Sequence, residues 1–484
     1  MAGAAAPPMD HRRRLVALAY PVYFELLAGV TAGIINMVWV ARLGGAAVAA
    51  VAVATNVENL LLGVILMAGS GTTVLVARAR GARDPAATRS AVRGGWALWA
   101  LITPVVAVGG YMCREPLARL VLGGSDGDAL ALTTGYFAIA LPGMAVYFAT
   151  SVVDGILKGA GDTRTPMRLA LLANGLILVL DPLFILGLGL GVRGAAIATV
   201  IGRTAALICG LVALRRRMRE EARDQPQPVR DRRTGSSRVS RVSRVSRVSR
   251  VRRLAADARA TAATGLPMSA DFVLRMTGAL ALIAVVARIG VGEVAAYGIA
   301  TKAMYLATMA FYSVRQAAAI HTAHLLGTGS DERRAVGRQA VLVAGVLGVG
   351  AALLLLAAGP WIMRAFGAEG EVADAGALYL RCLGPYLVLL ACFIALGGVF
   401  EGSGGSPALA RITGCGVVVQ LGLAYALSGL GLPGVCLAMA LSMAVQCAAV
   451  GRLYRRAGRT ASGCPARREP RSGGAGVSRR GGAW

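Results

Sequence analysis

Twelve long apolar segments, separated by short polar stretches, dominate this chain of 484 residues. A helix of about 20 apolar residues crosses the hydrocarbon core of a bilayer, whereas the strands of a membrane β-barrel would alternate over about ten residues. Only 15% of the residues are charged, while a soluble protein usually has about 25%. We therefore expect an all-α polytopic membrane protein with twelve transmembrane helices, at residues 15–41, 46–76, 94–112, 133–157, 167–190, 194–214, 262–287, 294–325, 338–359, 376–400, 408–428 and 432–451.

The distribution of basic residues predicts how the chain is oriented. The net charge is +27, but the basic residues lie between apolar segments and not in a folded domain with aromatic residues, which argues against a nucleic-acid-binding protein. Lys and Arg accumulate in the cytoplasmic loops of membrane proteins. With the N-terminus inside, 40 Lys and Arg residues fall inside and six outside. We predict a multi-pass protein of the cell (plasma) membrane with both termini in the cytoplasm.

The chain divides into two halves of six spans each. We expect an N-terminal six-helix bundle at residues 1–214 and a C-terminal six-helix bundle at 261–452. Between them, residues 215–260 form a basic cytoplasmic linker with five tandem Ser-Arg-Val triplets, a period that matches neither a helix stripe nor a strand. Residues 453–484 are rich in Gly and Arg, and we expect a disordered basic tail there.

The two halves repeat each other. When the first half is shifted by 246 positions, Pro21 falls on Pro267 and Glu25 falls on Asp271, and ordered Tyr, Pro and Gly matches follow at shifts of 243 and 240. Each half crosses the membrane an even number of times, so both enter from the same side and are parallel repeats. Such repeats are typical of alternating-access transporters, whose substrate sites lie near the repeat interface.

Three segments carry a resemblance to a known family: Lys-Gly-Ala-Gly-Asp-Thr-Arg-Thr-Pro-Met at 158–167, Leu-Asp-Pro-Leu-Phe at 180–184 and Gly-Ala-Ala-Ile-Ala-Thr at 194–199. Together they resemble the fifth- and sixth-helix signature of multidrug and toxic compound extrusion (MATE) transporters, closest to the prokaryotic DinF-like branch. The resemblance covers nearly the whole chain except the linker and the tail. It implies two six-helix bundles that export small organic, often cationic, compounds in exchange for protons, with sodium ions as the alternative.

The resemblance also implies where the coupling ion is handled. It assigns the polar cluster of the N-terminal bundle to Pro21, Tyr136, Asp181 and Thr199. Asn36 stands where the family's first helix has an Asp. Because an Asn side chain cannot release a proton, the family's pair of carboxylates is reduced to one here.

Charged residues at membrane depth are costly and usually functional. Asp181 lies in the middle of the fifth span with Asn174 on the same helix face, and a carboxyl group in apolar surroundings takes up a proton more readily than one in water. Glu25 lies one turn after Pro21 on the face that also carries Asn36. It could replace the missing first-helix carboxylate or serve as an interfacial structural residue.

Four further residues are candidates for a substrate cavity or hinge. Asp271 and Arg275 have the i, i+4 spacing of an ion pair, which could be functional or static. Glu58 is central in the second span, where packing and function are equally open, and Gln316 could line the cavity. Pro21 belongs to this group as a hinge.

We therefore interpret the chain as a proton-coupled secondary antiporter and not an enzyme. The alternatives are a lipid-linked saccharide flippase of the same superfamily and a membrane-embedded transferase. We expect a monomer whose partners are a small-molecule substrate and the lipid bilayer, with no nucleic acid and no cofactor beyond the coupling ion. No metal site is expected, since His321 and His324 provide too few ligands.

Overall fold

The computed structural model describes residues 8–122, 127–224, 247–365 and 367–462. Within these residues the regular structure is helical. The elements of the first half are α1 (Pro8–Ala41), α2 (Gly45–Gly81), α3 (Pro85–Pro104), η1 (Val105–Gly109), α4 (Gly110–Met112), α5 (Arg114–Val121), α6 (Asp128–Gly159), α7 (Arg164–Pro182), η2 (Leu183–Gly187) and α8 (Gly191–Asp224). Those of the second half are α9 (Arg247–Val286), α10 (Val291–Gly327), α11 (Arg333–Ala365), α12 (Gly370–Cys382), α13 (Gly384–Ser403), α14 (Ser406–Ala426), η3 (Ser428–Leu430) and α15 (Leu432–Ser462).

Twelve of the described helical stretches are long and apolar enough to cross a bilayer, which confirms the predicted fold class. The second and eighth spans, α2 and α10, each run for 37 residues and so exceed the bilayer's needs. In two spans the α-helix gives way to a π-helical turn directly after a proline, at Pro104 and at Pro182. A proline lacks the backbone N–H of the regular helical ladder, which is the local reason for the change.

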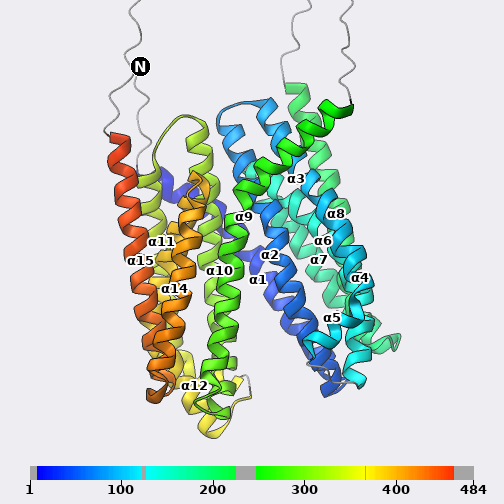
Figure 1. Cartoon of the computed structure of the whole chain (residues 1–484), viewed down its shortest axis with the longest axis vertical. Helices are drawn as coiled ribbons and strands as arrows, with labels where there is room; N and C mark the ends of the chain where they lie inside the picture. Colours follow the sequence, from blue (N-terminus) through cyan, green and yellow to red (C-terminus); the bar gives the residue numbers. More distant parts are fainter. Residues whose placement is uncertain (1–7, 123–126, 225–246, 366, 463–484) are drawn as a thin grey trace, which may run out of the picture.

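The described ends of both halves meet at one end of the molecule (Figure 1). The start of α1, the end of α8, the start of α9 and the end of α15 all lie there, so the two halves are parallel repeats. We call this end the terminal face and the opposite end the distal face. Figure 1 shows the two bundles side by side, with their distal ends further apart than their terminal ends.

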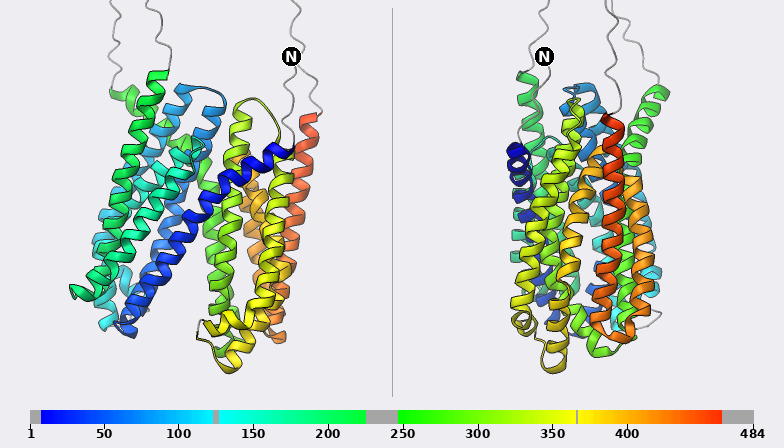
Figure 2. Two further views of the ribbon diagram at one scale, coloured as in Figure 1. Left: turned by 180° about the vertical axis from the view of Figure 1, so that it is seen from behind. Right: turned by 90° about the vertical axis from the view of Figure 1, so that its left-hand side faces the viewer.

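The opening helix of each half crosses from one bundle to the other. Leu15 and Leu18 of α1 belong to the hydrophobic cluster of the C-terminal bundle, whereas Val40, at the other end of α1, belongs to a cluster of the N-terminal bundle. Figure 2 shows the resulting diagonal path of α1. Buried Pro21 lies between the two parts.

The second half mirrors this exchange. Asp257 of α9 accepts hydrogen bonds from Ser90 (2.5 Å) and Arg93 (3.0 Å) on α3, while Val286 is buried in the C-terminal cluster. Pro267 lies between the two parts of α9. We call residues 8–20 and 247–266 the exchanged segments.

Helices extend into both regions expected to lack regular structure. α8 continues to Asp224 and α9 begins at Arg247, so the last Ser-Arg-Val triplet and two residues of the one before it are helical. α15 likewise continues to Ser462. The remainder of the predicted linker and tail, residues 225–246 and 463–484, lies outside the described residues.

Candidate functional site

Asp181 and Asn36 form a direct pair inside the N-terminal bundle. Asn36 Nδ2 on α1 donates a hydrogen bond to Asp181 Oδ2 on α7 at 2.7 Å. Asp181 is 1% exposed, and its other oxygen, Oδ1, is buried without a described hydrogen-bond partner. The α-helix changes to the π-turn η2 immediately after Asp181-Pro182. This carboxyl group therefore lies at a break in its helix and has an amide, not a cation, as its described hydrogen-bond partner.

The rest of the polar cluster predicted around Asp181 is only partly assembled. Tyr136 Oη donates to Glu58 Oε1 at 3.1 Å, which links the two in a pair of their own. Arg203 interacts electrostatically with this Glu58 and stacks on the Tyr147 ring, 3.7 Å from its centroid.

Two predicted members of the cluster make no hydrogen bond to Asp181 among the described contacts. Thr199 Oγ1 bonds to the Ala195 carbonyl of its own helix at 3.0 Å. Asn174 is half-buried on α7, and no described hydrogen bond joins it to Asp181.

Glu25 does not join Asp181; it pairs with Lys158. Lys158 Nζ at the end of α6 lies 2.7 Å from Glu25 Oε1, and both side chains are largely buried, at 10% and 14% exposure. Lys158 Nζ also lies 3.4 Å from Oε1 of Gln316 on α10, so the pair touches the other bundle. The hypothesis that Glu25 replaces the missing first-helix carboxylate is thus not supported by the geometry, because the Lys158 ammonium already neutralises it.

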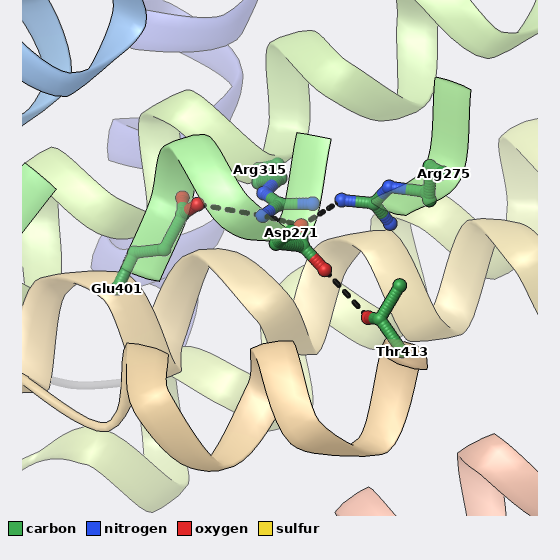
Figure 3. A network of polar contacts seen from close by, with 5 residues as sticks. All are labelled: Asp271, Arg275, Arg315, Glu401 and Thr413. Carbon is green, nitrogen blue, oxygen red and sulfur yellow. Dashed lines mark hydrogen bonds and ion pairs between the residues drawn. The ribbon is translucent and has the colours of Figure 1, made fainter. Parts of the chain in front are cut away.

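The C-terminal bundle contains a larger charge network (Figure 3). Asp271 Oδ2 forms an ion pair with Arg275, as the i, i+4 spacing predicted, and accepts from Arg315 Nη2 at 2.6 Å. Its Oδ1 accepts from Thr413 Oγ1 at 2.5 Å, and Arg315 Nη2 also donates to Glu401 Oε1 at 2.6 Å. Two carboxylates and two guanidinium groups balance one another here, so the network is neutral as a whole.

Sequence reasoning did not find the roles of Glu401 and Lys158. The signal was available in the repeat, because a shift of 243 places Lys158 on Glu401. In the N-terminal half this position is Lys158, which pairs with Glu25. In the C-terminal half it is Glu401, which pairs with Arg315. The two halves therefore repeat the helices while they differ in their charges.

Further contacts hold the bundles together at the terminal face. His11 Nδ1 of α1 lies 3.1 Å from His321 Nε2 of α10, and His11 Nε2 lies 2.9 Å from Glu332 Oε2. Gly81 of α2 and Gly327 of α10 approach so closely that a Cβ on either would clash with the other helix's backbone. These two glycines are partners in the repeat, 246 positions apart, so the pseudo-twofold axis passes between them.

Comparison with known proteins now identifies the family. The MatE family profile matches residues 21–183 and again residues 267–426. The two matches begin 246 positions apart, as the internal repeat does. The chain belongs to the MatE family. Its relatives include a DinF-like protein, as the motifs predicted.

Curated relatives align with one part of this MATE chain. It is 30% identical over 199 residues to "Probable multidrug resistance protein NorM" of Thermotoga maritima (40% of this chain, 42% of the relative). It is 31% identical over 208 residues to "DNA damage-inducible protein F" of Escherichia coli (41% and 43%). The "FAD transporter" of Shewanella oneidensis is 26% identical over 43% of this chain and 47% of its own. The alignments thus span less than half the length of each of these relatives.

Solved structures share the fold over nearly the whole chain. A MOP superfamily transporter from Pyrococcus furiosus superimposes with a TM-score of 0.81 at 22% identity, covering 94% of this chain and 97% of that one. The VcmN MATE transporter of Vibrio cholerae, solved as a mutant, gives 0.80 at 19% identity, covering 94% and 98%. At these identities the likeness concerns the fold alone.

Proposed function

We propose that this MATE transporter is a secondary antiporter that exports small organic compounds in exchange for protons, with Asp181 as the proton-carrying group. The observation that carries the proposal is the Asn36–Asp181 pair. Asp181 is buried, one of its oxygens lacks a described partner, and its described hydrogen-bond donor is a neutral amide. A buried carboxylate without a cation is costly and becomes neutral by taking up a proton. Loading and release of a proton at this position is the step that an antiporter needs.

The same geometry favours a proton over a sodium ion. A hard cation is held by several oxygen ligands. At Asp181 the described partner is instead the N–H donor of Asn36, whose positive end opposes a bound cation. The amide does stabilise a carboxylate, so it supports the deprotonated state between two protonation events.

Alternating access is supported by where the bundles touch. Lys158–Gln316, His11–His321 and the Gly81–Gly327 contact all lie toward the terminal face. Rupture of such contacts together with closure at the distal face would expose the interior to the other side. With the termini in the cytoplasm, as the charge bias predicts, the terminal face is the inner gate.

The family and the printed names of the relatives support export of small molecules more than the alternatives. Several relatives are named multidrug resistance or export proteins. A lipid-linked saccharide flippase would present many free cations to its lipid-linked substrate, yet Arg275 and Arg315 are neutralised by Asp271 and Glu401. The matching family is one of transporters and not of enzymes.

The test is pH-gradient-driven transport in proteoliposomes. Asp181→Asn keeps the size of the side chain and one oxygen that can accept the hydrogen bond from Asn36, but it cannot carry a proton. We expect it to reduce gradient-driven export at least 100-fold while substrate binding and thermal unfolding temperature stay near those of the wild type. Asn36→Asp places two carboxylates together, which cannot both ionise cheaply, so its activity should extend to higher pH.

The matched control is Asp374→Asn, an exposed carboxylate on α12, which should transport normally. Gradient-driven export by Asp181→Asn at the wild-type rate would overturn the assignment. A wild-type protein that responds to a sodium gradient and ignores a pH gradient would overturn proton coupling.

A further inference from the structure

Polar side chains are exposed on α2 and α10 in their distal halves, within the membrane-spanning stretch. Asn56 and Asn59 lie on α2, and Lys302 and Tyr305 lie on α10, all with exposed side chains. The two sets are partners in the repeat, since a shift of 246 places Asn56 on Lys302 and Asn59 on Tyr305. A lysine or an asparagine facing hydrocarbon is costly, so such residues face another bundle or a water-filled cavity.

Helix geometry places these residues between the bundles. Gly81 and Gly327 touch each other across the pseudo-twofold axis. Lys302 precedes Gly327 by 25 residues and Asn56 precedes Gly81 by 25, which is close to seven whole helical turns. Lys302 and Asn56 therefore point in the same directions as the touching glycines, toward the opposite bundle.

The core side of α10 confirms this direction. The fully buried residues Ala296, Ala300 and Phe311 lie on the face of α10 opposite to Gly327 and Lys302. Figure 1 shows the two bundles diverging toward the distal end, away from the contact between α2 and α10 at Gly81 and Gly327. The Lys302 face is thus the one that the two bundles present to each other, at a depth where their helices have separated.

Lys302 gives this face its net charge. None of the hydrogen bonds or ion pairs described for the chain involves Lys302. The other charged groups of α2 and α10 near this depth do not face Lys302. Glu58 accepts a hydrogen bond from Tyr136 on the opposite side of α2. Glu293 lies on the opposite side of α10 from Lys302. Asp271 is neutralised in its own bundle by two arginines. An ammonium group therefore stands on the facing surfaces of α2 and α10 without a countercharge.

We propose that Lys302 binds an acidic group of the exported compound, so that the substrate class is a small organic anion with a carboxylate, sulfonate or phosphate. The proposal rests on the export function proposed above and departs from the expectation of a cationic substrate. An ammonium group without a countercharge attracts an anion and repels an organic cation. The Tyr305 ring, one turn away, offers a flat surface for an aromatic part of the compound, and Asn56 and Asn59 can exchange hydrogen bonds with it.

Matched dyes test the substrate charge. Fluorescein and rhodamine 123 share a ring frame, and the first is anionic and the second cationic at neutral pH. In proteoliposomes of zwitterionic lipid driven by a pH gradient, we expect the wild type to export fluorescein at least tenfold faster than rhodamine 123. Lys302→Gln should lower fluorescein export about tenfold, and Lys302→Glu should reverse the preference.

The control variant is Arg364→Gln, which removes an exposed positive charge from the distal end of α11, away from the facing surfaces of α2 and α10. It should leave both rates unchanged. Wild-type preference for rhodamine 123, or unchanged fluorescein export by Lys302→Gln, would overturn the inference and leave the export function intact. Transport of neither dye would contradict the export function itself. If added anionic lipid abolishes the Lys302-dependent export, a lipid headgroup and not the substrate is the anion at this site.

Discussion

The carboxylates at membrane depth differ in what balances their charge. Asp271 has two arginines and a threonine, Glu25 has a lysine, and the described partner of Asp181 is only the Asn36 amide. Groups held by fixed cations stay ionised and serve as structural anchors, whereas a group without a cation is the one that can change its charge at low cost. This contrast with Asp271 and Glu25, and not mere burial, is the reason we propose Asp181 as the proton carrier.

The Glu25–Lys158 pair gives a prediction about stability. Glu25→Gln leaves the largely buried Lys158 ammonium without its carboxylate, and breaking such a pair costs on the order of 3–5 kcal/mol. We expect a clear fall in thermal unfolding temperature in detergent, which the double variant Glu25→Gln with Lys158→Met restores in large part. The pH profile of transport should keep its midpoint in the double variant. A shifted midpoint there would return Glu25 to the proton pathway.

At the residue scale, sequence predicted partners only where a local rule or a motif applied. The i, i+4 spacing gave Asp271–Arg275, and the family motif placed Asn36 and Asp181 in one cluster. The partners of Glu25 and Glu401 come from helices far away in the sequence. Helical periodicity says which face a side chain occupies but not which helix lies opposite, so Lys158 and Arg315 could not be assigned.

At the scale of elements, α2 and α10 are the two helices that meet at the pseudo-twofold axis. Their contact at Gly81 and Gly327 leaves no room for a side chain. Gly81→Val should therefore prevent closure at the terminal face and favour the state open on that side. We expect cysteine reporters near residue 316 to become accessible from the terminal face, together with at least a tenfold loss of transport.

Gly345→Val on α11 is the matched control, because nothing lies within 4 Å of a Cβ built there. It should transport as the wild type does. Normal transport by Gly81→Val would show that the two helices need not meet during the cycle.

The element count was predictable, while the paths of the elements were not. Apolar length alone identified all twelve spans, because a bilayer sets the length of a crossing helix. The seventh helix, α9, begins at Arg247, before its apolar stretch. The additional turns pack on α3, where Ser90 and Arg93 donate hydrogen bonds to Asp257 of α9. The diagonal courses of α1 and α9 follow from contacts between bundles, about which apolar length and charge bias contain no information.

At the scale of the whole molecule, the exchanged segments make the two halves depend on each other. We expect residues 1–236 or 237–484, produced alone, to pack poorly after membrane insertion and to be degraded. Each half lacks the surface on which its exchanged segment lies. Co-production of both pieces should restore pH-gradient-driven export to within severalfold of the intact chain. Purification of one half alone as a monodisperse, thermally cooperative protein would contradict this dependence.

The path of α1 also has a consequence in time. His11 leaves the ribosome well before its partner His321, which is made 310 residues later. At about 5–20 residues per second, the wait is roughly 15–60 s. Throughout that interval residues 8–20 lack the C-terminal helices on which they pack, and lipid or the insertion machinery must cover them. A segment that is synthesised long before its partner helix therefore reaches its final position late.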